Sequence, residues 1–173
     1  MCVISYIYKV VKIKRFIKAS SFKEKMDTIE ASMKPGKLSM GGFLGDAERL
    51  DEILRADDET VRKLGLSHEQ IADRIEYFIN AIGYPTSGGK VIDGKYLGGG
   101  VAYRGGQECP WNDVGFMMPA SNLDLFVKNQ ITNEELRFPG AIGHLIRQHH
   151  FYEGKGSPYR VDPIKIVRVL EIK

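Results

Sequence analysis

An amphipathic helix followed at once by glycine-bounded β-like segments constrains the fold of this chain most strongly. Residues 67–82 begin with a Ser-x-x-Gln pattern, typical of a capping box that satisfies free backbone N–H groups at a helix start. Gly83 and Pro85 then prevent the helix from continuing. One face of this helix is a continuous apolar stripe that must be buried against other elements. The stripe consists of Ile71, Ile75, Phe78, Ile79 and Ile82, of which we expect Ile75 and Phe78 to lie in the core.

The middle of the chain predicts a β-sheet. Asp93-Gly94 stands between two β-like segments and readily supplies the positive φ angles of a tight hairpin turn. Gly98–Gly100 follow, and we interpret them as a bulge or a site of close strand packing. A phosphate-binding loop is not predicted there, because no helix is predicted directly after the glycines and no Gly-Lys-Ser/Thr sequence occurs. Three further short strands are predicted at residues 101–103, 115–118 and 123–127.

The remaining segments set the order of the elements. Helices are predicted at residues 46–56 and 139–151, the second opened by Pro139, and the acidic residues 57–60 are expected to interrupt the first. Residues 164–172 are rich in β-branched side chains and mostly alternate, which predicts a closing strand. This order lacks the repeating βαβ pattern of a parallel sheet. The predicted fold is therefore α+β, with N-terminal helices followed by an antiparallel or mixed sheet and one C-terminal helix packed on it.

Positive charge is concentrated at the N-terminus. Residues 1–25 contain seven Lys or Arg residues and one Glu, a net charge of +6; the whole chain carries +3, so the remaining residues carry −3. We therefore predict a basic arm over residues 1–25 and a single α+β domain over residues 26–173. The arm fits a strand, fits a helix almost as well, or has no settled structure. Duplex nucleic acid is not expected as a partner, because most of the affinity for a duplex comes from positive charges that neutralise its phosphates, and the predicted domain is slightly acidic.

Cysteine content and hydropathy bear on the location of the protein. The chain has two cysteines, Cys2 and Cys109, and the terminal position of Cys2 gives little support for a structural disulfide, so we expect a reducing compartment. The apolar run at residues 1–8 is too short to span a bilayer. Positive charge follows this run, whereas in a secretory signal it comes first. A cytoplasmic protein without a membrane span is expected.

The loop over residues 105–113 is the first candidate site. It holds Cys109 and the sole tryptophan, Trp111, between predicted strands, and loops held by a rigid sheet often carry functional residues. Cys109 would be a nucleophile only if a histidine lay beside it in space. A buried, unreactive cysteine is the simpler interpretation.

A histidine-rich stretch at the end of the 139–151 helix is the second candidate. His144 and His149 lie five residues apart, about 140° around a helix, so we expect that they cannot bind one metal ion together. His149 and Glu153 share a helix face if the helix extends that far. The simpler interpretation of His149 is a partly buried side chain held by a carboxylate or a backbone carbonyl. Neither a metal site nor a cofactor is predicted.

The segment that follows brings Arg160 back towards the same region. Arg160 fits either a carboxylate or phosphate ligand, or an ion pair with Asp162 or Glu153. We expect any pocket to lie between the 109–113 loop and the end of the helix. Its predicted catalytic residues are Cys109, His149 and Glu153, and its predicted ligand-binding residues are Trp111, Asp113, Tyr159 and Arg160.

These residues match no known catalytic template. The leading hypothesis is a soluble intracellular domain that binds a small molecule or a peptide, without a cofactor. The alternative is a small enzyme that uses general acid–base or cysteine-nucleophile chemistry at a cleft formed by Cys109, His149 and Glu153. The sequence leaves the ligand, any protein partner and the oligomeric state open.

Overall fold

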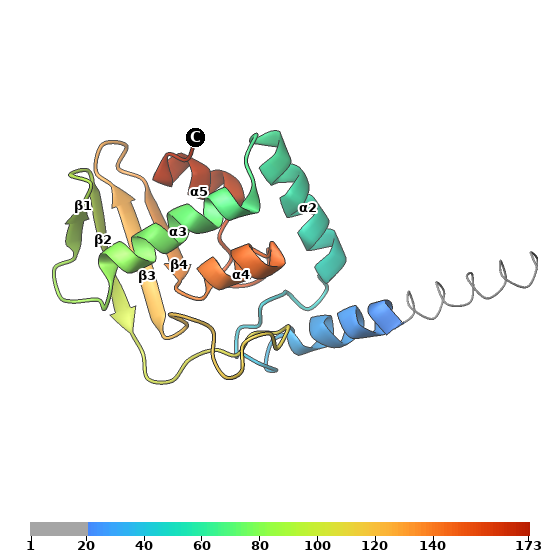
Figure 1. Cartoon of the computed structure of the whole chain (residues 1–173). Coiled ribbons are helices and arrows are strands. Elements are labelled where there is room, and N and C mark those ends of the chain that lie inside the picture. Colours follow the sequence, from blue (N-terminus) through green and yellow to red (C-terminus); the bar gives the residue numbers. More distant parts are fainter. Residues whose placement is uncertain (1–20) are drawn as a thin grey trace, which may run out of the picture.

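The computed structural model describes residues 21–173 (Figure 1). Along the chain, helices come before and after the four strands, which form one sheet. A helix over residues 21–32 is followed by a loop and then by two longer helices, the strands, and two final helices. This order confirms the predicted α+β class. The elements are α2 (Leu50–Lys63), α3 (His68–Ile82), β1 (Lys90–Ile92), β2 (Tyr96–Ala102), β3 (Leu123–Asn129), β4 (Glu135–Pro139), α4 (Ile142–His149) and α5 (Pro163–Leu170).

The sheet is antiparallel throughout, with its strands in chain order. The β1–β2 hairpin turns at Asp93 and Gly94, which both have positive φ angles as predicted. Helix α3 lies across the sheet and contacts β1 and β2, while α5 contacts β3 and β4 (Figure 1). Because side chains alternate along β3, Leu125 and Val127 are buried, and Asp124 and Phe126 point to the opposite face.

Helix α3 has the predicted start and the predicted buried face. The Ser67 hydroxyl accepts a hydrogen bond from the Gln70 backbone N–H, and the Gln70 side chain accepts one from the Ser67 N–H. Ile75 and Phe78 are fully buried, which confirms their predicted place in the core. Within residues 21–173, no helix is both long and apolar enough to cross a membrane.

Strand β2 runs directly through the three glycines. A Cβ atom on Gly98 would lie 2.7 Å from the Ile82 side chain, and one on Gly100 would collide with the backbone carbonyl oxygen of Asp124. The glycines therefore allow close packing of β2 against its neighbours, as predicted. The strand predicted separately at 101–103 is largely the end of this one strand.

The predicted interruption at residues 57–60 is wrong, because α2 continues to Lys63. Two side-chain contacts are made from this part of the helix. Asp57 is buried in an ion pair with Arg160, and the Thr60 hydroxyl donates a hydrogen bond to the carbonyl of Ala56, one turn earlier.

The predicted closing strand at 164–172 is also wrong, since this segment is helix α5 followed by a short tail. Asp162 caps the helix by accepting a hydrogen bond from the Lys165 N–H, and Pro163 occupies its first turn. Ile166, Val169 and Leu170 are buried at helical spacing. The apolar residues of this segment fit both periods, and packing against the sheet and α2 selects the helix.

The centre of the chain departs from the prediction in two further places. Residues 115–118 form no strand, and the last strand is instead β4, which was not predicted. Pro139 therefore ends a strand rather than opening a helix, and α4 begins at Ile142.

The predicted basic arm falls mainly on residues 1–20, outside the described residues. The described helix over residues 21–32 crosses the predicted boundary between residues 25 and 26. On the domain side of that boundary, Met26 and Ile29 pack on the core, and Met33 is fully buried.

Candidate functional site

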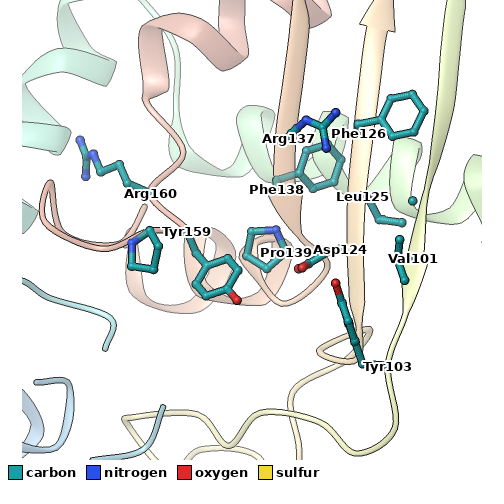
Figure 2. Close-up of a pocket in the computed structure, with 12 residues that line it drawn as sticks. Val101, Tyr103, Asp124, Leu125, Phe126, Arg137, Phe138, Pro139, Tyr159 and Arg160 are labelled. Carbon is teal, nitrogen blue, oxygen red and sulfur yellow. The ribbon is translucent and has the colours of Figure 1, made fainter. Parts of the chain in front are cut away.

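A cleft opens at the end of the sheet where β3 begins and β4 ends. It consists of two adjoining cavities of about 370 and 270 Å³, which suits a small ligand. The larger cavity lies against the sheet (Figure 2). The smaller one extends to the loop at residues 39–43, which lines it. We call the two cavities together the acidic cleft. They share the lining residues Tyr103, Asp124, Pro139 and Tyr159.

Glu153 lines the smaller cavity as a buried carboxyl group, with only 3% of its surface exposed. One carboxylate oxygen accepts a hydrogen bond from the Ser157 hydroxyl at 2.5 Å, and the other has no hydrogen-bond partner among the described residues. Burial raises the pKa of Glu153 to about 7, although the Ser157 hydrogen bond and the Arg160 charge oppose the shift. Glu153 also has a φ angle of 64°, a left-handed conformation that is costly for a residue with a side chain.

Asp124 and two tyrosines complete the polar part of the cleft. In Figure 2 the hydroxyl groups of Tyr103 and Tyr159 lie on either side of the Asp124 carboxylate. The nearby charge of Asp124 is the main cause that raises the pKa of Tyr159. No Lys or Arg within residues 21–173 lies within ion-pair distance of Asp124 or Glu153. The cleft therefore contains carboxyl groups without a cationic partner.

The two arginines near the cleft are already paired. Arg160 makes a bidentate ion pair with Asp57, at 2.5 and 2.7 Å, and also donates to the Glu153 carbonyl. Its side chain points away from the centre of the cavity in Figure 2. Arg137 binds Glu135 at 2.7 Å. The sequence proposed an ion pair of Arg160 with Asp162 or Glu153; the carboxylate that binds it belongs to Asp57, 103 residues away.

A second cluster of reactive side chains joins the loop between β2 and β3 to helix α4. One ligand atom each from Cys109, Asp113, His144 and His149 lies within 4.8 Å of the others. Asp113 contacts the Nε2 atoms of His144 at 3.2 Å and His149 at 2.9 Å, and the Cys109 sulfur lies 3.4 Å from His149 Nε2. We call these four residues the Cys-Asp-His-His cluster.

Trp111 holds one side of this cluster. Its ring stacks on His149 with a centroid distance of 4.0 Å and an interplanar angle of 4°. Burial, together with the Asp113 carboxylate beside it, raises the pKa of the Cys109 thiol to about 11. Burial also lowers the pKa of His149, against the opposing charge of Asp113. A neutral imidazole therefore faces an unactivated thiol.

The structure brings together some of the predicted site residues and separates others. Cys109, Trp111, Asp113 and His149 are neighbours. Glu153, Tyr159 and Arg160 instead lie at the acidic cleft, and no hydrogen bond within residues 21–173 links Glu153 to Cys109 or His149.

His144 and His149 lie side by side, although their angular spacing on the helix was expected to keep them apart. Their rings lie 5.5 Å apart, because His149 ends α4 and both side chains turn towards Asp113 from the facing loop. Angular spacing on an ideal helix describes Cβ directions, and long side chains at a helix end reach well beyond those directions.

Sequence reasoning also missed Asp124 and Tyr103. The available signal for Asp124 is a carboxylate within an alternating strand, in Leu123-Asp124-Leu125. Tyr103 carries no comparable signal, since its role depends on where the strand β2 ends.

Comparisons of this chain with known protein families, with curated proteins and with solved structures find no match.

Proposed function

We propose that this protein is an intracellular small-molecule-binding domain whose acidic cleft takes a compact organic cation, such as an amine or an amidinium group on a flat apolar body. The observation that carries the proposal is the buried carboxyl group of Glu153, which has no Lys or Arg within ion-pair distance among the described residues and lines a cavity that Asp124 also lines. Burying a carboxylate without a partner is costly, and a ligand cation would supply that partner.

The walls of the cleft favour the same class of ligand. The aromatic faces of Tyr103 and Tyr159 attract cations, and their hydroxyl groups can accept hydrogen bonds from a ligand. Phe126 and Phe138 add apolar surface to the larger cavity. An anionic ligand is disfavoured, since Arg137 and Arg160 already bind carboxylates.

Benzamidine and benzamide provide a direct test, because they have nearly the same shape and differ in charge. We expect the full-length protein to bind benzamidinium more tightly than benzamide in calorimetric titrations at about pH 8, where Glu153 is mostly ionised. Asp124→Asn and Glu153→Gln should each weaken benzamidinium binding by about tenfold or more, because each removes a charged hydrogen-bond acceptor.

Glu52→Gln is the matched control. Glu52 is exposed on α2 and lies outside the cleft, so its loss changes the net charge by the same amount. Equal binding of benzamide and benzamidinium, or an equal loss of affinity in Glu52→Gln, would contradict the proposal.

An enzyme with a cysteine nucleophile remains a second, less supported hypothesis. A Cys-His-Asp relay needs one ring nitrogen facing the thiol and the other facing the carboxylate. Here the same Nε2 atom of His149 faces both Cys109 and Asp113. The three residues predicted as catalytic also fail to converge, since Glu153 lies at the cleft.

A further inference from the structure

We infer that the Cys-Asp-His-His cluster is a zinc site that joins the β2–β3 loop to helix α4. The four side chains approach one another through the atoms that bind metals: the sulfur of Cys109, a carboxylate oxygen of Asp113, and the Nε2 atoms of His144 and His149. This inference does not depend on the proposed ligand of the acidic cleft.

The distances between these atoms fit a shared tetrahedral ion. Zinc bonds of about 2.0–2.3 Å at tetrahedral angles place neighbouring ligand atoms about 3.3–3.8 Å apart. The contacts of 3.4 Å between Cys109 and His149 and of 3.2 Å between His144 and Asp113 are close to that range. The contact of 2.9 Å between His149 and Asp113 is made by the carboxylate oxygen Oδ2, whereas His144 contacts Oδ1, so the carboxylate would turn to present one oxygen to the ion.

Without an ion, Asp113 can accept hydrogen bonds from both histidines, but the same contacts also bring the metal-binding atoms of all four residues to one point. A neutral imidazole Nε2 either donates or accepts one hydrogen bond, yet Nε2 of His149 faces both a thiol and a carboxylate. A central cation explains why four side chains, from the loop and from helix α4, all turn their metal-binding atoms towards one point.

The type and charge of the ligands select the metal. One thiolate and two imidazoles favour zinc over magnesium or calcium, which prefer oxygen ligands. A thiolate and a carboxylate together balance the two charges of Zn²⁺, so the loaded site is neutral. The side chains of His144 and His149 are only 9% and 10% exposed, and neutrality removes most of the cost of burying the ion.

A site with four protein ligands is closed, which is typical of structural zinc. The ion would fix the loop at residues 109–113 against the last turn of α4. Both flanks of this clamp continue into the acidic cleft, through Gln107 on the loop side and Glu153 beyond the helix. Zinc would therefore fix the positions of two walls of the cleft relative to each other.

Elemental analysis of the full-length protein, purified without a chelator and without a polyhistidine tag, is the first test. We expect about one zinc ion per chain, bound at a single four-ligand site. Cys109→Ser and His144→Gln should each lower zinc affinity at least about 100-fold, since even supporting residues around a metal typically contribute 10–100-fold. Cys2→Ser and His150→Gln are matched controls that should retain the zinc; His150 is exposed and stacks on His68 instead.

The single tryptophan gives an independent signal from the site itself. Because Trp111 stacks on His149, adding Co²⁺ to the metal-free protein should quench its fluorescence. The cobalt form should show a thiolate-to-metal charge-transfer band that Cys109→Ser lacks. A chelator should lower the thermal midpoint of the wild-type protein and leave that of Cys109→Ser unchanged.

Circular dichroism establishes whether each variant is folded, and His144→Gln repeats the test if Cys109→Ser is not. A folded wild-type protein that binds no zinc after reconstitution would overturn the inference. Full zinc retention in a folded Cys109→Ser/His144→Gln double variant would also overturn it, because the ion would then lie elsewhere.

Discussion

Glu153 is a buried carboxyl group on a left-handed backbone, at a point where a cleft reaches it. Its environment contains Ser157, which donates to it, Arg160 and Tyr159 beside it, and Asp124 from β3. Ser157 and Arg160 favour the ionised form of Glu153, whereas burial and the charge of Asp124 favour the protonated form. Burial has the largest effect on its pKa. The residue therefore changes its charge near neutral pH. A strained and buried conformation of this kind persists only where the surrounding structure holds it in place.

The raised pKa of Glu153 predicts how stability depends on pH. The folded-state pKa of about 7 lies above the ordinary value of 4.5, so the unfolded chain releases this proton first as pH rises. The contribution of Glu153 to the free energy of unfolding should therefore fall between about pH 4.5 and pH 7, by up to about 3 kcal/mol, and level off above. Glu153→Gln should lack this component.

Urea unfolding at several pH values measures this effect as the difference between wild type and Glu153→Gln. Taking the difference removes the opposite contributions of Glu48 and Asp58, whose pKa values are lowered in the folded state. If the difference between the two proteins stays constant from about pH 5 to pH 8, the environment assigned to Glu153 is wrong.

At the scale of elements, β2 and β3 form the part of the sheet that positions the cleft. Gly100 pairs with Leu125, next to Asp124, so the spacing between the two strands sets where the Asp124 carboxylate lies. The glycine is required for steric reasons, because the atom nearest to a Cβ at this position would be the backbone carbonyl oxygen of Asp124, which cannot move aside as a flexible side chain can.

We therefore predict that Gly100→Ala destabilises the protein by at least about 1–3 kcal/mol, the range for overpacking in a dense interior. Gly115→Ala is the control, because a Cβ there meets nothing within 4 Å and the residue is exposed. Chemical unfolding of both variants compares them directly. Equal stabilities would show that β2 and β3 separate easily and that the glycines have another role.

At the scale of the whole molecule, the contacts of the first described helix begin at Met26. Residues 21–25 are exposed, whereas Glu30 accepts a hydrogen bond from the backbone of Leu50 at the start of α2. Met33 is fully buried in the core. The part of this helix that joins the domain thus lies on the domain side of the charge boundary predicted between residues 25 and 26.

A chain that begins at Met26 should fold cooperatively, with a thermal midpoint within about 4 °C of the full-length protein, since it loses less than about 1 kcal/mol of described contacts. A chain that also lacks residues 26–33 should be strongly destabilised, because it loses Met33 and the Glu30 hydrogen bond. Differential scanning calorimetry measures both. Loss of the transition in the first chain would mean that residues 1–25 supply part of the core.

The sequence alone determined the features that depend on neighbouring residues. The capping box and apolar stripe of α3, the Asp93-Gly94 turn and the close packing of Gly98–Gly100 were all predicted correctly. Their physics acts within a few residues, through backbone hydrogen bonds, φ preferences and side-chain size. The α+β class followed from the order of these local elements.

Tertiary structure decided the features that depend on distant contacts. Residues 163–170 carry a pattern compatible with a strand or a helix, and packing against α2 and the sheet selected the helix. The partners of Arg160 and of Cys109 lie 103 and 40 residues away in the chain. No local rule relates such residues, so both the acidic cleft and the Cys-Asp-His-His cluster became visible only when folding brought their parts together.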